Sequence, residues 1–416
     1  MAGQEVKIAG WVHEIRDIGK IMFLLVRDRT GIAQVIAKRG VTDAGIMESM
    51  SLPKESVIMV KGVIKANPES KKGFEIIPFE VKNLNPLKET MPFEVTGKVP
   101  ADIDVRLNNR QIDIRREETT AIFNIQSTIL ESFRNTLIKE GFNEIRTPVL
   151  VKEATEGGSD LFSVDYFGTN AYLAQSPQIY KQLAVIGGLD RVFVITPVFR
   201  AEKSNTTFHL NEITQMDIEM GFADYNDAIH MLKHVSQNIL EEVKKQNPKD
   251  LELLGVEIKN TKIHELTYSD AVKKLNEKGH PMEFGKDFSR ADEEAIHNFF
   301  GDLVLIKEFP TAVRAFYSMP SEENPEFCHS YDLIYKGLEI SSGAQRIHDP
   351  SMLADALKKR GEDPEKFSFY INSFKQGAPP HAGWSIGLER LTMKLTNMSN
   401  IRECALFPRD RTRLVP

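Results

Sequence analysis

The feature that most restricts the fold of this chain is the placement of charged residues inside β-rich segments of its second half. Four stretches, residues 173–183, 194–222, 331–348 and 378–395, alternate strand-forming residues with arginine, lysine and carboxylates. Burying such groups is costly unless they are paired or bind a ligand. A sheet that carries them therefore predicts a cleft for a charged ligand.

Arginines and carboxylates in one cleft suit a polyphosphate. Arginine forks neutralise phosphate oxygens, and carboxylates hold the Mg²⁺ that bridges those oxygens. The sequence has no GxxxxGK[ST] loop and no GxGxxG after a strand. Neither a P-loop nor a Rossmann nucleotide site is therefore expected, and a nucleotide would bind by another route.

The first 85 residues have the pattern of a small β-barrel. Five β-rich segments, separated by Gly, Asp, Asn and Pro, cover residues 6–15, 21–29, 31–38, 56–66 and 73–84. Five such strands fit a closed barrel of the OB type, which often binds single-stranded nucleic acid. Residues 1–85 carry 13 Lys and Arg against 10 Asp and Glu, whereas the whole chain has a net charge of −6. This mildly basic start is compatible with phosphate contact. The strand pattern alone favours the alternative, a barrel without a ligand.

The rest of the chain predicts an α+β catalytic domain. Residues 86–117 hold three prolines and little periodicity, so a hinge is expected there. The catalytic domain is expected over 118–416, with a charged helical insertion at about 224–300. It would begin with an amphipathic helix whose apolar residues have helical spacing: Ile122, Ile125, Ile129, Phe133 and Leu137.

Bulk properties agree with several soluble domains. A chain of 416 residues is too long for one core. It has no apolar run of about 20 residues and no signal-peptide layout at its start. Cys328 and Cys404 are far apart and outside any CxxC spacing, which argues against a disulfide framework or a cysteine-rich zinc site. We expect a cytoplasmic protein without a membrane partner.

Three segments resemble the motifs of class II aminoacyl-tRNA synthetases. Residues 141–150 (GFNEIRTPVL) resemble motif 1, residues 197–220 (PVFRAEKSNTTFHLNEITQMDIEM) motif 2, and residues 383–395 (GWSIGLERLTMKL) motif 3. With the ending at 400–416, they occur in order over nearly the whole chain. Within the class, the chain is similar to aspartyl-tRNA synthetases of the archaeal and eukaryotic type. This resemblance implies an anticodon-binding OB-fold, an antiparallel catalytic sheet flanked by helices, and a homodimer with Pro148 at its interface.

The resemblance also implies a reaction. ATP would activate L-aspartate to aspartyl-adenylate, and the aspartyl group would pass to the 3′ end of tRNA(Asp). The substrate carboxylate is already a nucleophile, so positioning and charge neutralisation would carry catalysis. Arg200, Glu202 and Arg390 would be catalytic and would contact ATP together with His209 and Glu339. Mg²⁺ would bind Glu339 and Asp332, which are expected on one strand that also carries Arg346.

A further set of residues would bind the amino acid: Glu156, Ser176, Gln178, Lys181, Asp217 and Arg346. Arg346 would clamp the side-chain carboxylate and Asp217 would hold the α-ammonium. Lys181 favours aspartate over asparagine, since a neutral amide gains little from an ammonium group. Lysyl-tRNA synthetases share the architecture, but acids are expected there at positions 181 and 346.

Some of these residues have structural alternatives. In these alternatives, Lys181 is a solvated helix residue, Arg346 pairs with a structural acid, and His209 only caps a turn. Two positions also depart from the family pattern. Phe208 stands where an arginine often precedes the histidine, and Ile213 stands where an aromatic residue often stacks on adenine.

In the barrel, the resemblance assigns anticodon contacts to Arg16, Phe23, Gln34 and Glu75. Phe23 would stack on a base, although a place in the barrel core is its alternative. His13 and Lys71 lie where the family varies between enzymes that charge only tRNA(Asp) and enzymes that also charge tRNA(Asn). In the family, histidine at position 13 accompanies charging of both tRNAs, and lysine at position 71 accompanies charging of tRNA(Asp) alone. This pair of residues therefore leaves open whether tRNA(Asn) is also charged. Other functional alternatives are an asparagine-type synthetase, an amide ligase with the same adenylate chemistry, and an inactive RNA-binding paralogue.

Overall fold

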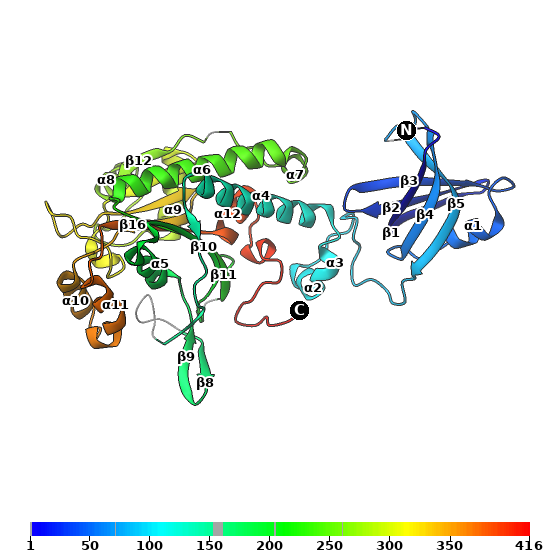
Figure 1. Ribbon diagram of the computed structural model, residues 1–416. Helices are drawn as coiled ribbons and strands as arrows, with labels where there is room; N and C mark the ends of the chain where they lie inside the picture. Colours follow the sequence, from blue (N-terminus) through cyan, green and yellow to red (C-terminus); the bar gives the residue numbers. More distant parts are fainter. Residues whose placement is uncertain (1, 71, 153–160, 204, 260) are drawn as a thin grey trace. The chain divides into compact units, whose positions relative to one another are not determined.

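The computed structural model describes residues 2–70, 72–152, 161–203, 205–259 and 261–416 (Figure 1). The predicted contacts Lys71 and Glu156 lie outside these residues. The chain divides into two compact units, Met1–Arg106 and Leu107–Pro416. The division falls inside the segment 86–117 that was expected to be a hinge, where two short helices form, α2 (Ile103–Asn108) and α3 (Arg110–Asp113). No helix in the described ranges is both long and apolar enough to cross a membrane.

The first unit is a closed barrel, as the sequence predicted. Its strands follow the order β1-β2-β3-β5-β4. Their bounds are β1 (Glu5–Ile18), β2 (Ile21–Asp28), β3 (Gly31–Lys38), β4 (Val57–Ala66) and β5 (Phe74–Asn85), with α1 (Ala44–Met50) between β3 and β4. Alternate residues of β2, namely Met22, Leu24 and Val26, are buried in the barrel core, whereas Phe23 is only half-buried. The core alternative for Phe23 is therefore wrong.

The second unit is built on an eight-stranded sheet, counted over the described residues, with the order β12-β13-β14-β15-β16-β11-β10-β6. Neighbouring strands are antiparallel except for the two outermost pairs, β12 with β13 and β10 with β6. The bounds are β6 (Asn143–Glu144), β10 (Arg191–Phe199), β11 (Glu212–Gly221), β12 (His264–Thr267), β13 (Leu303–Lys307), β14 (Ser330–Tyr335), β15 (Leu338–Gln345) and β16 (His381–Gly387). The mostly antiparallel sheet confirms the predicted α+β class.

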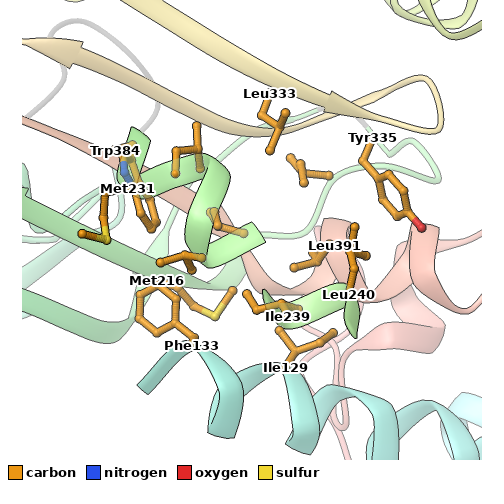
Figure 2. Packing of buried hydrophobic residues seen from close by; sticks show 14 of the residues in the cluster. Ile129, Phe133, Met216, Met231, Ile239, Leu240, Leu333, Tyr335, Trp384 and Leu391 are labelled. Atoms are coloured by element: carbon orange, nitrogen blue, oxygen red, sulfur yellow. The ribbon is translucent and has the colours of Figure 1, made fainter. Parts of the chain in front are cut away.

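Two long helices lie side by side against this sheet, α4 (Glu117–Lys139) and α6 (Tyr225–Gln246) (Figure 1). All five spaced apolar residues expected on the first helix are buried. The Asn238 side chain of α6 donates a hydrogen bond to Thr136 of α4 at 2.6 Å. Figure 2 shows residues of both helices, such as Phe133 and Ile239, packed with Met216 and Trp384 of the sheet. This core fixes the sheet strands that carry the charged residues.

The segment 224–300 is largely helical. Its first helix, α6, is part of the main core. The remainder holds α7 (Pro248–Leu253), α8 (Tyr268–Glu277) and α9 (Arg290–Phe300), while β12 extends the sheet edge. The α8 and α9 helices share a smaller core with β12 and β13.

Shorter elements complete the unit. A small sheet contains β7 (Leu150–Val151), β8 (Ser163–Tyr166) and β9 (Thr169–Leu173). The other elements are α5 (Gln178–Ala184), η1 (Val185–Leu189), η2 (Thr311–Val313), α10 (Pro350–Lys359), η3 (Pro364–Phe367), α11 (Ser368–Phe374), α12 (Leu388–Leu395) and η4 (Ile401–Cys404).

One local expectation is wrong. Asp332, Glu339 and Arg346 were expected on one strand, but Asp332 lies on β14 and Glu339 on β15, and Arg346 directly follows β15. Lys336 and Gly337 both have positive φ, 45° and 69°, which reverses the chain as a two-residue hairpin turn does. The two carboxylates therefore lie on neighbouring strands.

Candidate active site

The arginine pocket is a cavity of about 190 Å³ between the ends of β10 and β11, β15, and the junction of β16 with α12. Its walls bring together the five residues predicted to contact ATP: Arg200, Glu202, His209, Glu339 and Arg390. They come from three parts of the sequence, and the sheet order places those parts side by side. The two departures from the family pattern, Phe208 and Ile213, also line this pocket.

Charges of both signs alternate around the arginine pocket. Arg200 lies 3.8 Å from Glu202, and Nε2 of His209 lies 3.8 Å from the same carboxylate. Burial, helped by Arg390 and Arg200, lowers the pKa of His209 although Glu202 opposes the shift. Nδ1 of His209 also contacts the Thr206 hydroxyl at 2.6 Å, which is the turn contact considered as its structural alternative.

The loop between β10 and β11 is held by the C-terminal segment. Arg402 donates to the carbonyl of Thr206 at 2.9 Å and Arg411 to the carbonyl of Lys203 at 3.0 Å. The backbone N–H of Asn211 donates to the carbonyl of Arg409 at 2.8 Å. No role was predicted for these arginines, because their partners are backbone atoms some 200 positions away along the chain.

Two carboxylates of the sheet are close enough to repel each other. Burial and the nearby Asp332 raise the pKa of Glu339 to about 7. Arg314 donates to Asp332 at 2.7 Å and to the Ser342 hydroxyl at 2.7 Å. Mg²⁺ usually takes one or two carboxylates together with substrate phosphates. A pair of crowded carboxylates beside the arginine pocket fits that donor set, and a cation between them would relieve the repulsion.

A second set of residues, the charge cluster, is buried beside the arginine pocket: Lys181, Asp217, Glu219 and Arg346. The Lys181 ammonium lies 2.8 Å from Asp217 and 3.4 Å from Glu219. Arg346 donates through Nε and Nη2 to both oxygens of Glu219, at 2.9 and 3.2 Å. Two cations and two anions therefore neutralise one another in a site that excludes water.

The charges of the cluster perturb one another strongly. Burial alone would raise the pKa of Glu219, but Arg346 and Lys181 outweigh burial and lower it. Burial also favours the neutral form of Arg346, yet the bound Glu219 carboxylate raises the pKa of this guanidinium. Burial raises the pKa of Asp217, since Lys181 and Ser385 offset it only in part. The cluster depends on all its ion pairs being present together.

A buried hydrogen-bond network lies behind the cluster. Gln182 accepts from Gln178 at 2.9 Å and from the Tyr370 hydroxyl at 2.8 Å, and its amide nitrogen contacts Nε2 of His381 at 2.8 Å. Nδ1 of His381 lies 2.8 Å from the carbonyl of Pro379, so it carries the proton and Nε2 accepts. Burial lowers the pKa of His381, in agreement with a neutral ring. The Gln178 side chain is thus engaged inside the protein.

The arginine pocket and the charge cluster are connected by Ser385. Its side chain lines the pocket, and its hydroxyl donates to Asp217 at 3.0 Å. In the sheet register, Asp332 pairs with Ser342, Ser342 with Ser385, and Ser385 with Asp217. One polar row across β14, β15, β16 and β11 therefore connects the crowded carboxylates to the cluster.

The barrel unit has its own groove, of about 860 Å³. Five predicted residues line it: His13, Arg16, Phe23, Gln34 and Glu75. Arg27 and Glu55 form a buried ion pair at 2.8 Å behind it, and Arg27 also donates to Nδ1 of His13 at 3.0 Å. Because arginine is always a donor, Nδ1 of His13 is unprotonated. A half-buried aromatic ring with polar groups around it suits the stacking of an unpaired base.

Comparison with known families agrees with both units. The model of the tRNA synthetases class II (D, K and N) matches residues 102–411. The model of the OB-fold nucleic acid binding domain matches residues 6–84. The chain belongs to the class II tRNA synthetases of the D, K and N group.

Relatives of this synthetase match this chain from end to end and cover nine tenths or more of their own length. A protein of Methanocaldococcus jannaschii named Aspartate--tRNA(Asp/Asn) ligase is 49% identical over 100% of this chain and 96% of the relative. A protein of Methanothermobacter thermautotrophicus with the same name is 45% identical over the same shares. Among solved structures, the asparaginyl-tRNA synthetase of Pyrococcus horikoshii complexed with asparaginyl-adenylate has a TM-score of 0.96 at 30% identity, covering 100% of this chain and 97% of that chain. The aspartyl tRNA synthetase of Entamoeba histolytica has a TM-score of 0.89 at 32% identity, covering 100% of this chain and 90% of that chain.

The predicted residues of the synthetase therefore fall into groups. The residues predicted to contact ATP share the arginine pocket, while Lys181, Asp217 and Arg346 share the charge cluster. Lys181 is 1% exposed, so its alternative as a solvated helix residue is wrong. Arg346 has the structural acid that its alternative required, Glu219. Ser176 is buried in the turn before α5, where its hydroxyl accepts from the N–H of Gln178 at 3.3 Å.

No role was predicted for Glu219, Arg314 or Ser385. A signal existed for Glu219, because it lies two residues after Asp217 on a strand and must share its face. For Arg314 and Ser385 the sequence held no comparable signal, since their partners lie on other strands.

Gly383 is expected to be important for the stability of the fold, because its backbone packs closely against the side chain of Glu219. A Cβ atom at Gly383 would lie 2.3 Å from the carbonyl oxygen of Ile218 and 2.4 Å from Oε2 of Glu219. Gly383→Ala is expected to displace the Glu219 carboxylate and to lower the free energy of unfolding by about 1–3 kcal/mol. Urea denaturation of the full-length protein, followed through the unfolding of the second unit (Leu107–Pro416), measures this change.

Gly387→Ala is the matched control on the same strand. Its Cβ would meet nothing nearer than Arg390 at 3.8 Å. The free energy of unfolding should stay within about 0.5 kcal/mol of the parent protein. Equal destabilisation by both substitutions would contradict the close packing of Gly383 on Glu219.

Proposed function

We propose that this synthetase is an aspartate–tRNA ligase that joins L-aspartate to tRNA in two steps at the expense of ATP. The observation that supports it most is the burial of Lys181 and Arg346 next to the arginine pocket, joined to it through Asp217 and Ser385. The names of the full-length relatives point the same way.

In the first step, an oxygen of the α-carboxylate of aspartate attacks the α-phosphorus of ATP. The bond to the bridging oxygen breaks, pyrophosphate leaves, and aspartyl-adenylate forms. Arg200 and Arg390 both line the arginine pocket and would neutralise phosphate oxygens there, so negative charge that develops in the transition state meets fixed cations. The aspartate carboxylate needs no base, and the pocket lowers the barrier by holding the two reactants together.

Glu339 and Asp332 would hold Mg²⁺, with Arg314 keeping Asp332 in place. The metal would supply charge neutralisation at the phosphates. Arg390 also donates to the backbone carbonyl of Glu339 at 3.2 Å, so the phosphate-binding arginine and the metal-binding acid are positioned by each other.

Selection of aspartate would rest on donors that the charge cluster leaves for a ligand. An ammonium has three donors, and Lys181 directs two of them at Asp217 and Glu219. Arg346 donates from Nε and Nη2 to Glu219. Its remaining nitrogen, Nη1, would donate to a second carboxylate, that of the substrate side chain. Asp217 would accept from the substrate's α-ammonium. Asparagine would present an amide NH₂, which is itself a donor, so some of these donors would be left without an acceptor.

The direct test is aspartate-dependent exchange of labelled pyrophosphate into ATP. The parent protein should exchange with aspartate at least about a hundredfold faster than with asparagine, because a desolvated charge pair contributes several kcal/mol. Lys181→Met should lower exchange by about a hundredfold or more. A thermal melt checks that the variant folds.

Lys233→Met is the control, because Lys233 pairs with Glu265 on the surface, away from the site. Its exchange rate should equal that of the parent. Exchange with asparagine but not with aspartate would overturn the proposed amino-acid specificity.

We further propose that the enzyme charges both tRNA(Asp) and tRNA(Asn), as the names of its relatives suggest. Charging of purified transcripts of both tRNAs should give kcat/KM values within about tenfold of each other, which corresponds to a difference of no more than about 1.4 kcal/mol. Phe23→Ala should lower both values by about fivefold to a hundredfold through lost stacking. Charging of tRNA(Asp) alone would restrict the enzyme to one tRNA.

The homodimer implied by motif 1 is also a proposal. Apolar side chains near this motif are exposed: Ile138, Leu150 and Leu189. Covering them is favourable by the hydrophobic effect. Sedimentation equilibrium should give a mass near twice 47.1 kDa, and a mass near one chain at micromolar concentration would contradict the dimer.

A further inference from the structure

Phe208 makes an unusual contact in the arginine pocket. Its half-buried ring lines the pocket. The Cζ atom of Arg290 lies 4.6 Å from the centre of this ring. Arg290 is the first residue of α9, about 80 positions away along the chain. A guanidinium is therefore present beside position 208, but it comes from another element.

Arg290 also touches the hairpin that carries Glu339. Its Nη1 donates to the carbonyl of Gly337, in the turn between β14 and β15. The packing is close there, since a Cβ atom at Gly337 would lie 3.1 Å from Cα of Glu294. Arg290 thus joins the motif 2 loop, the start of α9 and the β14–β15 turn, and the first and last of these segments lead into the pocket wall.

The charge of Arg290 is already shared by two carboxylates. Nη1 donates to Glu293 at 3.0 Å, and Nη2 lies 3.3 Å from Glu294. Glu293 is itself buried and accepts from the backbone N–H of Glu339. A guanidinium held in this way is poorly placed to bind phosphate directly. It is well placed to fix the segments around it.

We propose that Arg290 is a positioning residue for ATP: it holds Phe208 as a wall of the arginine pocket and, through Gly337 and Glu293, holds the strand that carries Glu339. The planar guanidinium covers one face of the ring, which is the favoured geometry for a cation on an aromatic side chain. Phenylalanine at 208 is then the matching partner, because an arginine there would face Arg290 with a like charge.

The inference rests on the proposed function only in its kinetic part, because ATP binding can be measured without an amino acid. Isothermal titration of the full-length protein with ATP and Mg²⁺ gives the dissociation constant. Arg290→Met, which keeps an apolar stem without the charge, and Phe208→Leu, which removes the ring, should each weaken ATP binding by about threefold to tenfold. The double variant should bind ATP no more than about twofold more weakly than the weaker single variant, because Arg290→Met already removes the contact with Phe208.

A charge swap tests the match between the two positions. Phe208→Arg should weaken ATP binding at least as much as Phe208→Leu, since it brings two guanidiniums together. Adding Arg290→Met to Phe208→Arg should recover part of the loss. A purely structural role would give no such recovery.

Lys278→Met is the control. Lys278 lies 5.1 Å from the ring of Phe299 in the same helical segment, and neither residue lines the arginine pocket. ATP binding should be unchanged in this variant. In pyrophosphate exchange, the Arg290 and Phe208 variants should raise KM for ATP and leave KM for aspartate within about twofold.

Unchanged ATP binding in Arg290→Met, or additive losses in the double variant, would overturn the positioning role. So would an equal rise of both KM values, which would indicate general damage to the domain. Absence of aspartate-dependent exchange in the parent protein would instead contradict the proposed function, and the ATP titrations would still decide the role of Arg290.

Discussion

The site depends on the mutual neutralisation of four buried charges, Lys181, Asp217, Glu219 and Arg346. Each alone would be too costly to keep in a position that excludes water, so the four residues stabilise one another only as a group. Strand geometry makes the group possible, because Asp217 and Glu219 are two positions apart on β11 and face the same side of the sheet. Lys181 arrives from α5 and Arg346 from the end of β15, and both are fixed by the anions they meet.

The same sheet geometry connects this cluster to the arginine pocket. Asp217, Ser385, Ser342 and Asp332 occupy paired positions on four successive strands. Ser385 donates to Asp217, while Arg314 joins Ser342 to Asp332. A row of this kind leaves little freedom for one end to move without the other. The proposed amino-acid and metal sites are therefore positioned by one framework, as a reaction between two bound substrates requires.

The sequence predicted this architecture where the signal is local or ordered along the chain. Alternating strands gave the barrel, helical spacing gave α4, and the motifs in order gave the catalytic sheet. The sequence did not predict those side-chain contacts whose partners are determined only by the order and register of the strands. The pairing of Glu219 with Arg346 needs β11 and β15 to flank β16. The contact of Arg314 with Ser342 as well as Asp332 needs the turn at Lys336 and Gly337, which places β15 beside β14. The contact of Phe208 with Arg290 joins α9 to the motif 2 loop, and no pattern in either segment points to the other.

The backbone of this fold does not by itself select an amino acid. The catalytic chain superposes on an asparaginyl-tRNA synthetase with a TM-score of 0.96 at 30% identity, so the distinction between two nearly isosteric substrates must come from side chains. The charge cluster is neutral as a whole, so net charge alone would not attract a dicarboxylic amino acid. Directed donors remain, namely the third hydrogen of the Lys181 ammonium and the Nη1 edge of Arg346. A carboxylate can accept from both, whereas an amide presents one oxygen and a donor that meets another donor. In the proposed selection of aspartate, specificity follows from unpaired donors in a dry site, where each unmade hydrogen bond is far more costly than in water.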